Sequence, residues 1–144
     1  MAYYKTLQAL GTVPMPIPSG PGVVACRMSY TFGAAFALNE LLELGTLPAN
    51  CVPVDFIVDT DDLGTAGALS LGVINSGKTD LDGTAWATAI DVNTAAAGIR
   101  ATSAQLLLMN RLAPSAADQV IGFKATTATT AAGTLGLTLF YRLA

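Results

Sequence analysis

The sequence contains no histidine and little charge: seven lysine or arginine residues and ten acidic residues make up 12% of its 144 positions. Because no imidazole is present, histidine-dependent catalytic triads and histidine-ligated zinc sites are excluded. Two cysteines are too few for an all-cysteine zinc site. Soluble domains usually carry about 25% charged residues. We therefore expect either a bland surface rich in threonine, serine, alanine and glycine, or a surface covered in good part by partners.

The charge balance and the order of the residues argue against further classes of protein: nucleic-acid-binding, membrane-spanning and secreted proteins. A net charge of −3 argues against nucleic-acid binding, which needs clustered lysine and arginine to contact phosphates. No stretch approaches about 18 uninterrupted apolar residues, so no membrane-spanning segment is expected. The first residues lack the basic-then-apolar order of a secretory signal. Cys26 and Cys51 are therefore expected to be reduced and buried, in a protein that folds in a reducing cytoplasm.

Residues 1–22 differ in pattern from the rest of the chain. Pro14, Pro16, Pro18 and Pro21 block helix and sheet pairing and favour an extended path. The segment is also apolar, so it is not expected to float freely in water. Two interpretations remain open: an ordered arm packed on its own domain, or an arm that lies on a neighbouring subunit.

From Val23 onward, alternation of apolar and polar residues predicts short strands. Seven segments are expected to form strands, of which 105–109 is apolar on both faces: 23–31, 52–58, 69–73, 99–102, 105–109, 121–125 and 135–141. The spacing of the leucines in 34–44 instead predicts one or two helical turns. Many short strands without a long helix indicate an all-β fold. We expect a jelly-roll-like β-sandwich, a single domain over 23–144, with an extended Pro-rich N-terminal arm over 1–22.

Two motifs match ligand-binding patterns but lack the surroundings that binding needs. Residues 72–79 fit the phosphate-loop pattern G-x-x-x-x-G-K-[ST], yet strand alternation runs into them, and Asp80, Asp82 and Gly83 follow where a helix should begin. A hairpin turn is expected there instead. Residues 59–64 match the first two carboxylate positions and the glycine of a calcium loop, but the third ligand and the bidentate glutamate are missing. Solvated turn carboxylates that accept backbone N–H bonds are the favoured interpretation.

The residue inventory offers little for catalysis. Glu40 and Glu43 are the sole glutamates and Trp86 the sole tryptophan, so a glycosidase cleft with paired carboxylates and aromatic walls is not expected. Serine, cysteine or lysine nucleophiles would lack an imidazole base. The aromatic residues are scattered along the chain, which favours core positions over sugar stacking. The sequence therefore predicts no catalytic residues, no cofactor and no metal site.

A run of small uncharged residues covers 125–134 and includes Thr126, Thr127, Thr129 and Thr130. One interpretation is a flexible hairpin loop. The other is a flat contact surface between subunits, where small side chains permit close approach.

Two parts of the chain resemble small virion proteins of tailed bacteriophages. The first is the turn LGTLPAN at 44–50, followed by the alternating strand pattern of 52–60. The second joins the apolar segment 121–123 to the terminal strand pattern 133–141. The resemblance is to the decoration, or cement, proteins that sit outside the icosahedral head, and it covers most of residues 23–144.

This resemblance implies a jelly-roll or related sandwich that forms a homo-oligomer, often a trimer, made in the host cytoplasm. It implies a place on the outer capsid surface of the virion, where the subunit bridges neighbouring copies of the major capsid protein, without nucleic-acid or membrane partners. An extended arm is a frequent means of such bridging, so removal of residues 2–20 is expected to leave a folded domain that no longer holds the shell. The expected contact residues are Tyr3, Tyr4, Leu7, Pro14, Met15, Ile17, Thr126, Thr127, Thr129 and Thr130. The alternative is a jelly-roll module of a tail or fibre that binds a host glycan.

Overall fold

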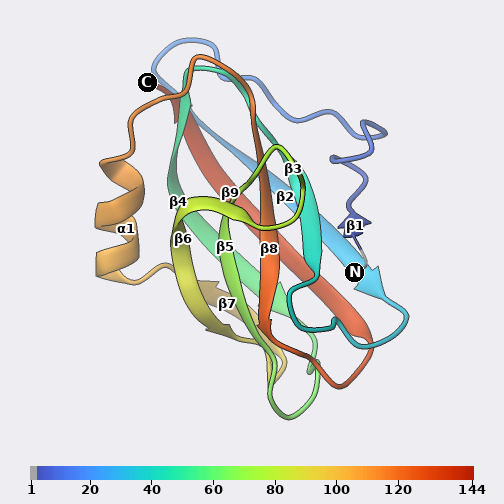
Figure 1. Ribbon diagram of the computed structural model, residues 1–144. Helices are drawn as coiled ribbons and strands as arrows, with labels where there is room; N and C mark the ends of the chain where they lie inside the picture. Colours follow the sequence, from blue (N-terminus) through green and yellow to red (C-terminus); the bar gives the residue numbers. More distant parts are fainter. Residues whose placement is uncertain (1–2) are drawn as a thin grey trace.

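Two β-sheets packed face to face form the body of the protein, as Figure 1 shows for the computed structural model, which describes residues 3–144. Alternating apolar and polar residues make most segments strand-forming, with one apolar side for the interior. The strands are β1 (Tyr3–Lys5), β2 (Val23–Phe32), β3 (Leu41–Leu47), β4 (Cys51–Thr60), β5 (Ala68–Ile74), β6 (Leu81–Asp91), β7 (Ala96–Arg100), β8 (Gln119–Thr127) and β9 (Gly133–Leu143). The helix α1 spans Ser103–Asn110.

The strand order is that of a jelly roll. One sheet has the order β1-β3-β8-β5-β6 and the other the order β2-β9-β4-β7. From β2 to β9, successive strands alternate between the sheets except at the β5–β6 hairpin, and each hydrogen-bonded pair of these strands is antiparallel. Eight strands in two four-stranded sheets define this architecture. The predicted jelly-roll sandwich is therefore confirmed, with β1 as an additional parallel strand on the edge at β3.

The core lies between the inner faces of the two sheets. In β9, Leu135, Leu137, Leu139 and Tyr141 all face inward and are fully buried, which is the period of two that the sequence displays. Strand β9 lies in the interior of its sheet, between β2 and β4, so its apolar face meets the opposite sheet along its whole length.

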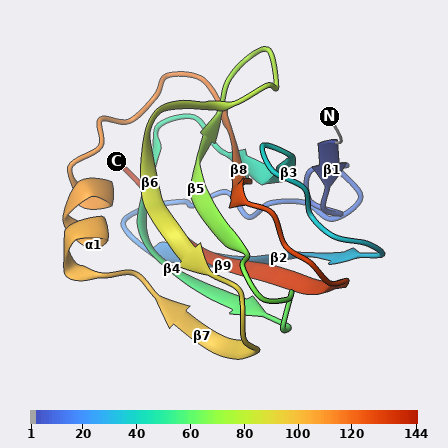
Figure 2. The ribbon, with the colours of Figure 1, turned by 60° about the horizontal axis from the view of Figure 1, so that its bottom comes forward.

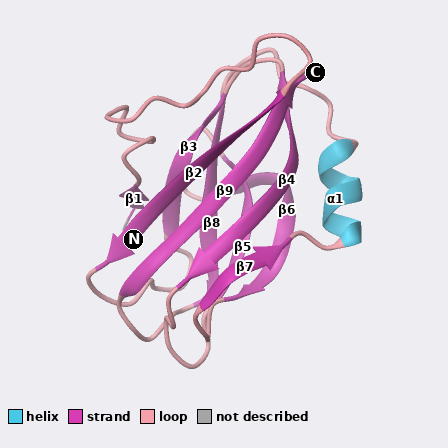
Figure 3. Cartoon of the chain, turned by 180° about the vertical axis from the view of Figure 1, so that it is seen from behind, coloured by secondary structure: helices cyan, strands magenta, loops and turns pink. Residues whose placement is uncertain are grey.

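The two open sides of the sandwich are closed by different segments. Figures 1 and 3 show α1 along one side, where it contacts β4 and β6. Figure 2 shows β1 and the segment that follows it on the opposite side, next to β2 and β3. Because sheet edges would otherwise leave core side chains exposed, both segments are part of the folded unit.

The predicted helix over 34–44 is wrong. Residues 33–40 form a loop, and the apolar run continues as β3, in which Leu42 and Leu44 belong to the core. Leu41 and Glu43, on the other face of the strand, are buried as well. A strand buried on both faces has a continuous apolar run, which periodicity alone does not distinguish from a helix.

The opposite error occurs at 105–109, where a strand was expected and the helix α1 forms. Thr102 caps the helix: its hydroxyl accepts a hydrogen bond from the Gln105 backbone N–H, and the Gln105 side chain accepts one from the Thr102 N–H. This reciprocal capping box specifies a helix start, and it outweighs the local strand-like run of leucines. The other predicted strands are present, with boundaries shifted by a few residues.

The segment that matches a phosphate-loop pattern is a hairpin turn, as expected. Strand β5 leads into it and β6 leaves it, so no helix N-terminus is available for a phosphate. The Asn75 side-chain oxygen accepts hydrogen bonds from the N–H groups of Thr79 (2.9 Å) and Asp80 (3.4 Å). Lys78 adopts a positive φ of 55° within the turn.

Candidate interaction surface

The N-terminal arm begins as a strand that is anchored by a buried carboxylate. The Tyr3 hydroxyl donates to Glu43 Oε1 at 2.5 Å, and Lys78 Nζ lies 3.3 Å from the same oxygen. Lys78 Nζ also lies 5.5 Å from the centre of the Tyr3 ring. Burial, together with the hydrogen bond to Glu43, raises the pKa of Tyr3, so the phenol remains neutral and keeps donating. Tyr3 therefore positions the arm on its own domain.

Tyr4 points the other way, into a cluster of aromatic rings. Its ring centre lies 5.4 Å from that of Tyr30, 5.0 Å from Phe32 and 5.7 Å from Phe36. The last two contacts are edge-to-face, the arrangement that the quadrupoles of aromatic rings favour. The Tyr4 hydroxyl donates to Glu40 at 3.1 Å. Tyr4 thus joins the arm to the core at the end of β2.

Farther along, Met15 fills the open side of the sandwich. Its sulfur lies 3.6 Å from Cys26 Sγ, and a Cβ on Gly45 would lie 2.9 Å from it, so the glycine makes room for the methionine. The Tyr141 hydroxyl donates to the Pro16 carbonyl oxygen. Burial raises the pKa of Tyr141 to about 12. The contacts of residues 3–16 favour the first of the two interpretations of the arm, in which it is ordered and packs on its own domain.

The outward side of the arm is apolar and solvent-exposed. Leu7, Leu10, Val13 and Ile17 are 54%, 60%, 37% and 77% exposed, and we call these four side chains the arm ridge. Leu7 and Ile17 belong to the contact residues expected from the sequence, and Pro14, also exposed, lies between them. The contact residues expected from the sequence did not include Leu10 and Val13, although both are large apolar residues of the same segment.

The threonine run lies at one end of the sandwich and is held by hydrogen bonds. Thr126, Thr127 and Thr130 are exposed, whereas Thr129 is 3% exposed. The Thr129 hydroxyl accepts from the Phe36 N–H at 2.7 Å, so its side chain fastens two loops together and does not face solvent. The structure does not bring this run next to the arm ridge: Figure 1 places the 128–132 loop at the lower end, while the arm runs upward from β1.

The acidic residues at the end of β4 and in the loop that follows it make contacts within the chain. Asp59 forms a 2.5 Å ion pair with Arg27, and Asp61 accepts from the Thr134 N–H at 2.7 Å. Asp62 accepts from the Gly64 N–H at 2.9 Å, the turn role expected from the sequence. Within residues 3–144, no group of three or more cysteine or acidic side chains is arranged to hold a metal ion.

A hollow of about 380 Å³ lies on the side of the sandwich that carries α1. Trp86, Leu108 and Leu112 line it, together with Val52 and Pro53. Trp86 is only 3% exposed, so it has no free ring face on which a sugar could stack. No helix of the described residues is long and apolar enough to cross a membrane.

Fold and surface together define a class: a jelly-roll protein whose N-terminal arm exposes large apolar side chains. No protein-family model matches the chain, and no curated protein matches it. A chain in the capsid of Ralstonia phage GP4 is 31% identical, with 99% of each chain covered and a TM-score of 0.82. A chain in the capsid asymmetric unit of cyanophage Pam1 is 17% identical over 93% of this chain and 96% of that chain, with a TM-score of 0.60, a likeness of fold alone. The protein belongs to a family of phage capsid-related proteins.

Proposed function

We propose that this protein decorates the outside of a phage head and stabilises the capsid by bridging neighbouring capsid subunits. It acts as a structural protein of the virion, without catalysis. The observation that carries the proposal is the 31% identity to a chain of the GP4 capsid over 99% of both chains.

The chemistry of the surface supports the same proposal. Charged residues are scarce, and the arm exposes large apolar side chains to solvent. Clustered exposed apolar side chains mark contact sites in soluble proteins. We take the partners to be the major capsid protein and further copies of this chain, with a trimer as the favoured oligomer. The contact residues are Leu7, Pro14 and Ile17 of the arm and, at the loop end, Thr126, Thr127 and Thr130.

The protein stabilises the capsid because it binds the assembled head and not the free capsid subunit. A protein that binds only the assembled shell shifts the equilibrium toward the shell by mass action. Symmetry repeats each contact many times over the head, so contacts that are individually weak add up.

The alternative, a tail or fibre module that binds a host glycan, has less support. Such modules place aromatic rings on an accessible surface, whereas Trp86 is buried and Tyr4 packs among three other rings. The 380 Å³ hollow is lined by polar residues, among them Asp82, Thr84 and Gln119, as well as apolar ones, and Trp86, the aromatic residue of its lining, is 3% exposed.

Sedimentation with heads tests the proposal. Heads of the phage that encodes this chain, assembled without it, are mixed with the purified protein and separated on a density gradient. We expect the protein to sediment with the heads and to saturate at a fixed number of copies per head. Heads that already carry the protein are the control and should take up none. Protein that stays at the top of the gradient at every concentration would contradict the proposal, and thermal stabilisation by a host glycan would then favour the alternative.

A further inference from the structure

We propose that a groove between β6 and α1 binds an extended segment of the capsid protein, one that carries a large apolar side chain and, beside it, a lysine or arginine. The groove lies on the side of the sandwich opposite the arm, so it is a contact surface separate from the contact residues named above. The inference rests on the proposed function for the source of the segment, which is the phage head.

Three cavities in a row make up the groove. The central one is the hollow of about 380 Å³ described above, a size within the range of about 300–1,000 Å³ that ligand pockets have. It shares Trp86 and Leu108 with a cavity of about 280 Å³ that continues along α1. Next to the β5–β6 turn it shares Val73 and Asp82 with a cavity of about 360 Å³. The three cavities therefore form one continuous groove.

Strand β6 forms one wall, and its irregular pairing with β5 widens the groove. Val73 of β5 pairs with Asp82. The next pair joins Leu71 to Ala87, so β6 carries extra residues between the two pairs and bulges over 83–86. Such bulges are frequent next to functional sites. Within residues 3–144, β6 pairs with β5 alone, so backbone groups on its other edge are available to an extended partner segment.

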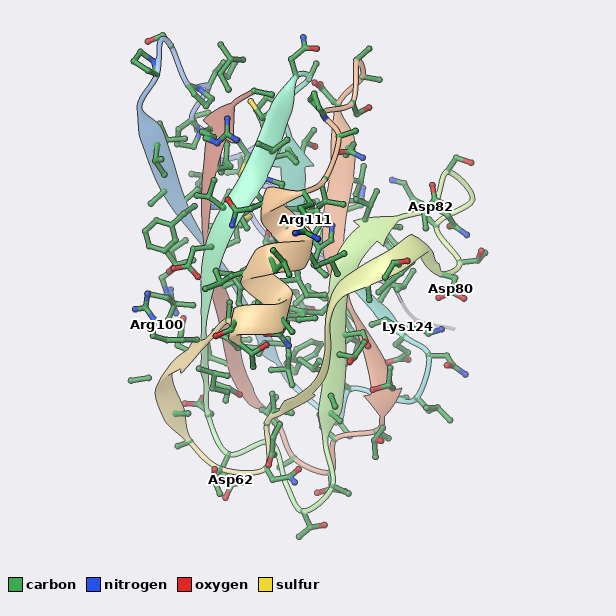
Figure 4. All side chains as sticks on the ribbon, turned by 90° about the vertical axis from the view of Figure 1, so that its left-hand side faces the viewer. Asp62, Asp80, Asp82, Arg100, Arg111 and Lys124 are labelled. Carbon is green, nitrogen blue, oxygen red and sulfur yellow. The ribbon has the colours of Figure 1, made fainter. Side chains whose placement is uncertain are left out.

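The helix α1 and the residues that follow it form the other wall. The Asn110 side-chain amide donates to the Val54 carbonyl oxygen at 3.4 Å, which holds the helix against β4. Figure 4 shows α1 beside β6, with Asp82 near the start of β6 and Arg111 at the end of the helix. Arg111 does not line any of the three cavities. The helix thus covers the edge of β4 and leaves a groove beside β6.

The middle of the groove suits one large apolar side chain. Trp86, Leu108 and Leu112 line it, and Pro53 closes it toward β4. Contact between these residues and an apolar side chain of the partner would remove apolar surface of both proteins from water.

The end of the groove next to the β5–β6 turn is acidic. Asp82 and Asp118 line it, and within the described residues neither forms an ion pair. Asp118 accepts a hydrogen bond from the Ala49 N–H at 2.8 Å, which leaves its charge in place. Lys78 also lines this end, but its Nζ lies 3.3 Å from Glu43, whose charge offsets it. The two aspartates therefore favour a lysine or arginine on the partner.

The same charges argue against the arm of another copy as the occupant. From Thr6 to Cys26 the chain has no lysine or arginine, so the exposed part of the arm offers no cation to Asp82 and Asp118. The occupant is therefore assigned to the other partner in the proposed function, the capsid protein.

Sedimentation with heads and amide hydrogen exchange test the inference. The groove variant Thr84→Lys/Thr88→Lys places two long cationic side chains in the groove. Its control, Thr94→Lys/Ala97→Lys, adds the same charge at two exposed positions outside it. We expect the groove variant to bind heads at least tenfold more weakly than the wild type, and the control to bind as the wild type does. Both variants should keep the urea unfolding midpoint of the wild type, because all four positions are exposed. In head-bound wild type, the amides of 83–88 should exchange more slowly than in the free protein.

Equal head binding by the groove variant and the control, or unchanged exchange of 83–88 in head-bound wild type, would overturn the inference and leave the proposed function standing. Slow exchange of 83–88 that grows with the concentration of free protein would identify a second copy as the occupant and would also overturn it. A wild type that does not bind heads contradicts the proposed function, and the inference with it.

Discussion

Removal of residues 2–16 should lower the free energy of unfolding by about 3 kcal/mol or more, because burial of each large apolar side chain contributes about 1.5–3 kcal/mol. The deletion removes Tyr4 from its contacts with three aromatic rings and Met15 from the open side of the sandwich. It also removes β1 from the edge at β3 and leaves the Tyr141 hydroxyl without its carbonyl acceptor. Urea denaturation followed by circular dichroism measures the change.

Two variants separate the two sides of the arm. Tyr4→Ala should reproduce part of the loss of stability, because it leaves a cavity in the aromatic cluster while the rest of the arm remains. Leu10→Ser should leave the unfolding midpoint of the single chain unchanged, because Leu10 is 60% exposed. An unchanged midpoint after deletion of residues 2–16 would show that the sandwich folds independently of the arm, as the sequence alone led us to expect.

Substitution of Gly122 by alanine should also destabilise the protein strongly, by roughly 3 kcal/mol, since overpacking a filled core costs about 1–3 kcal/mol and occasionally more. A Cβ at this position would lie 2.4 Å from the Leu42 carbonyl oxygen on β3 and 2.5 Å from Ile74 Cδ1 on β5. The oxygen belongs to the backbone, so relief requires β3 and β8 to move apart. Thermal or urea unfolding of Gly122→Ala measures this loss of stability.

Gly98→Ala is the matched control. Gly98 lies on the edge strand β7, where no heavy atom would lie within 4 Å of an added Cβ. Its unfolding midpoint should equal that of the wild type. Equal midpoints for Gly122→Ala and Gly98→Ala would contradict the close approach of β8 to β3.

Much of the sandwich follows from the sequence because its strands have one buried and one exposed face. Strands β4 and β9 show the period of two clearly, and both were predicted with nearly correct bounds. Strand β6 was not predicted, and the two segments that were assigned the wrong structure have a common cause. In β3 both faces are buried, and in α1 four apolar residues follow one another, so neither segment has the periodicity expected of its own structure. The capping box at Thr102 and Gln105 was visible in the sequence and would have identified α1.

The candidate surface was predicted in part. The apolar, proline-rich composition of residues 1–22 identified the arm, but composition gives no direction to a side chain. Tyr3, Tyr4 and Met15 turn inward, to a buried glutamate, an aromatic cluster and the open side of the sandwich, whereas Leu7 and Ile17 face solvent. These directions depend on strands far away in the sequence, which no local pattern reveals.

The temperature at which heads release their DNA tests whether this protein stabilises the head. Heads with and without the bound protein are heated in the presence of a dye that fluoresces on free DNA. We predict that the decorated heads release DNA at a higher temperature and that the shift grows with occupancy until the heads are saturated, because a protein that binds only the assembled shell shifts the equilibrium toward the shell. Equal release temperatures, with the protein shown by sedimentation to be bound, would contradict the account.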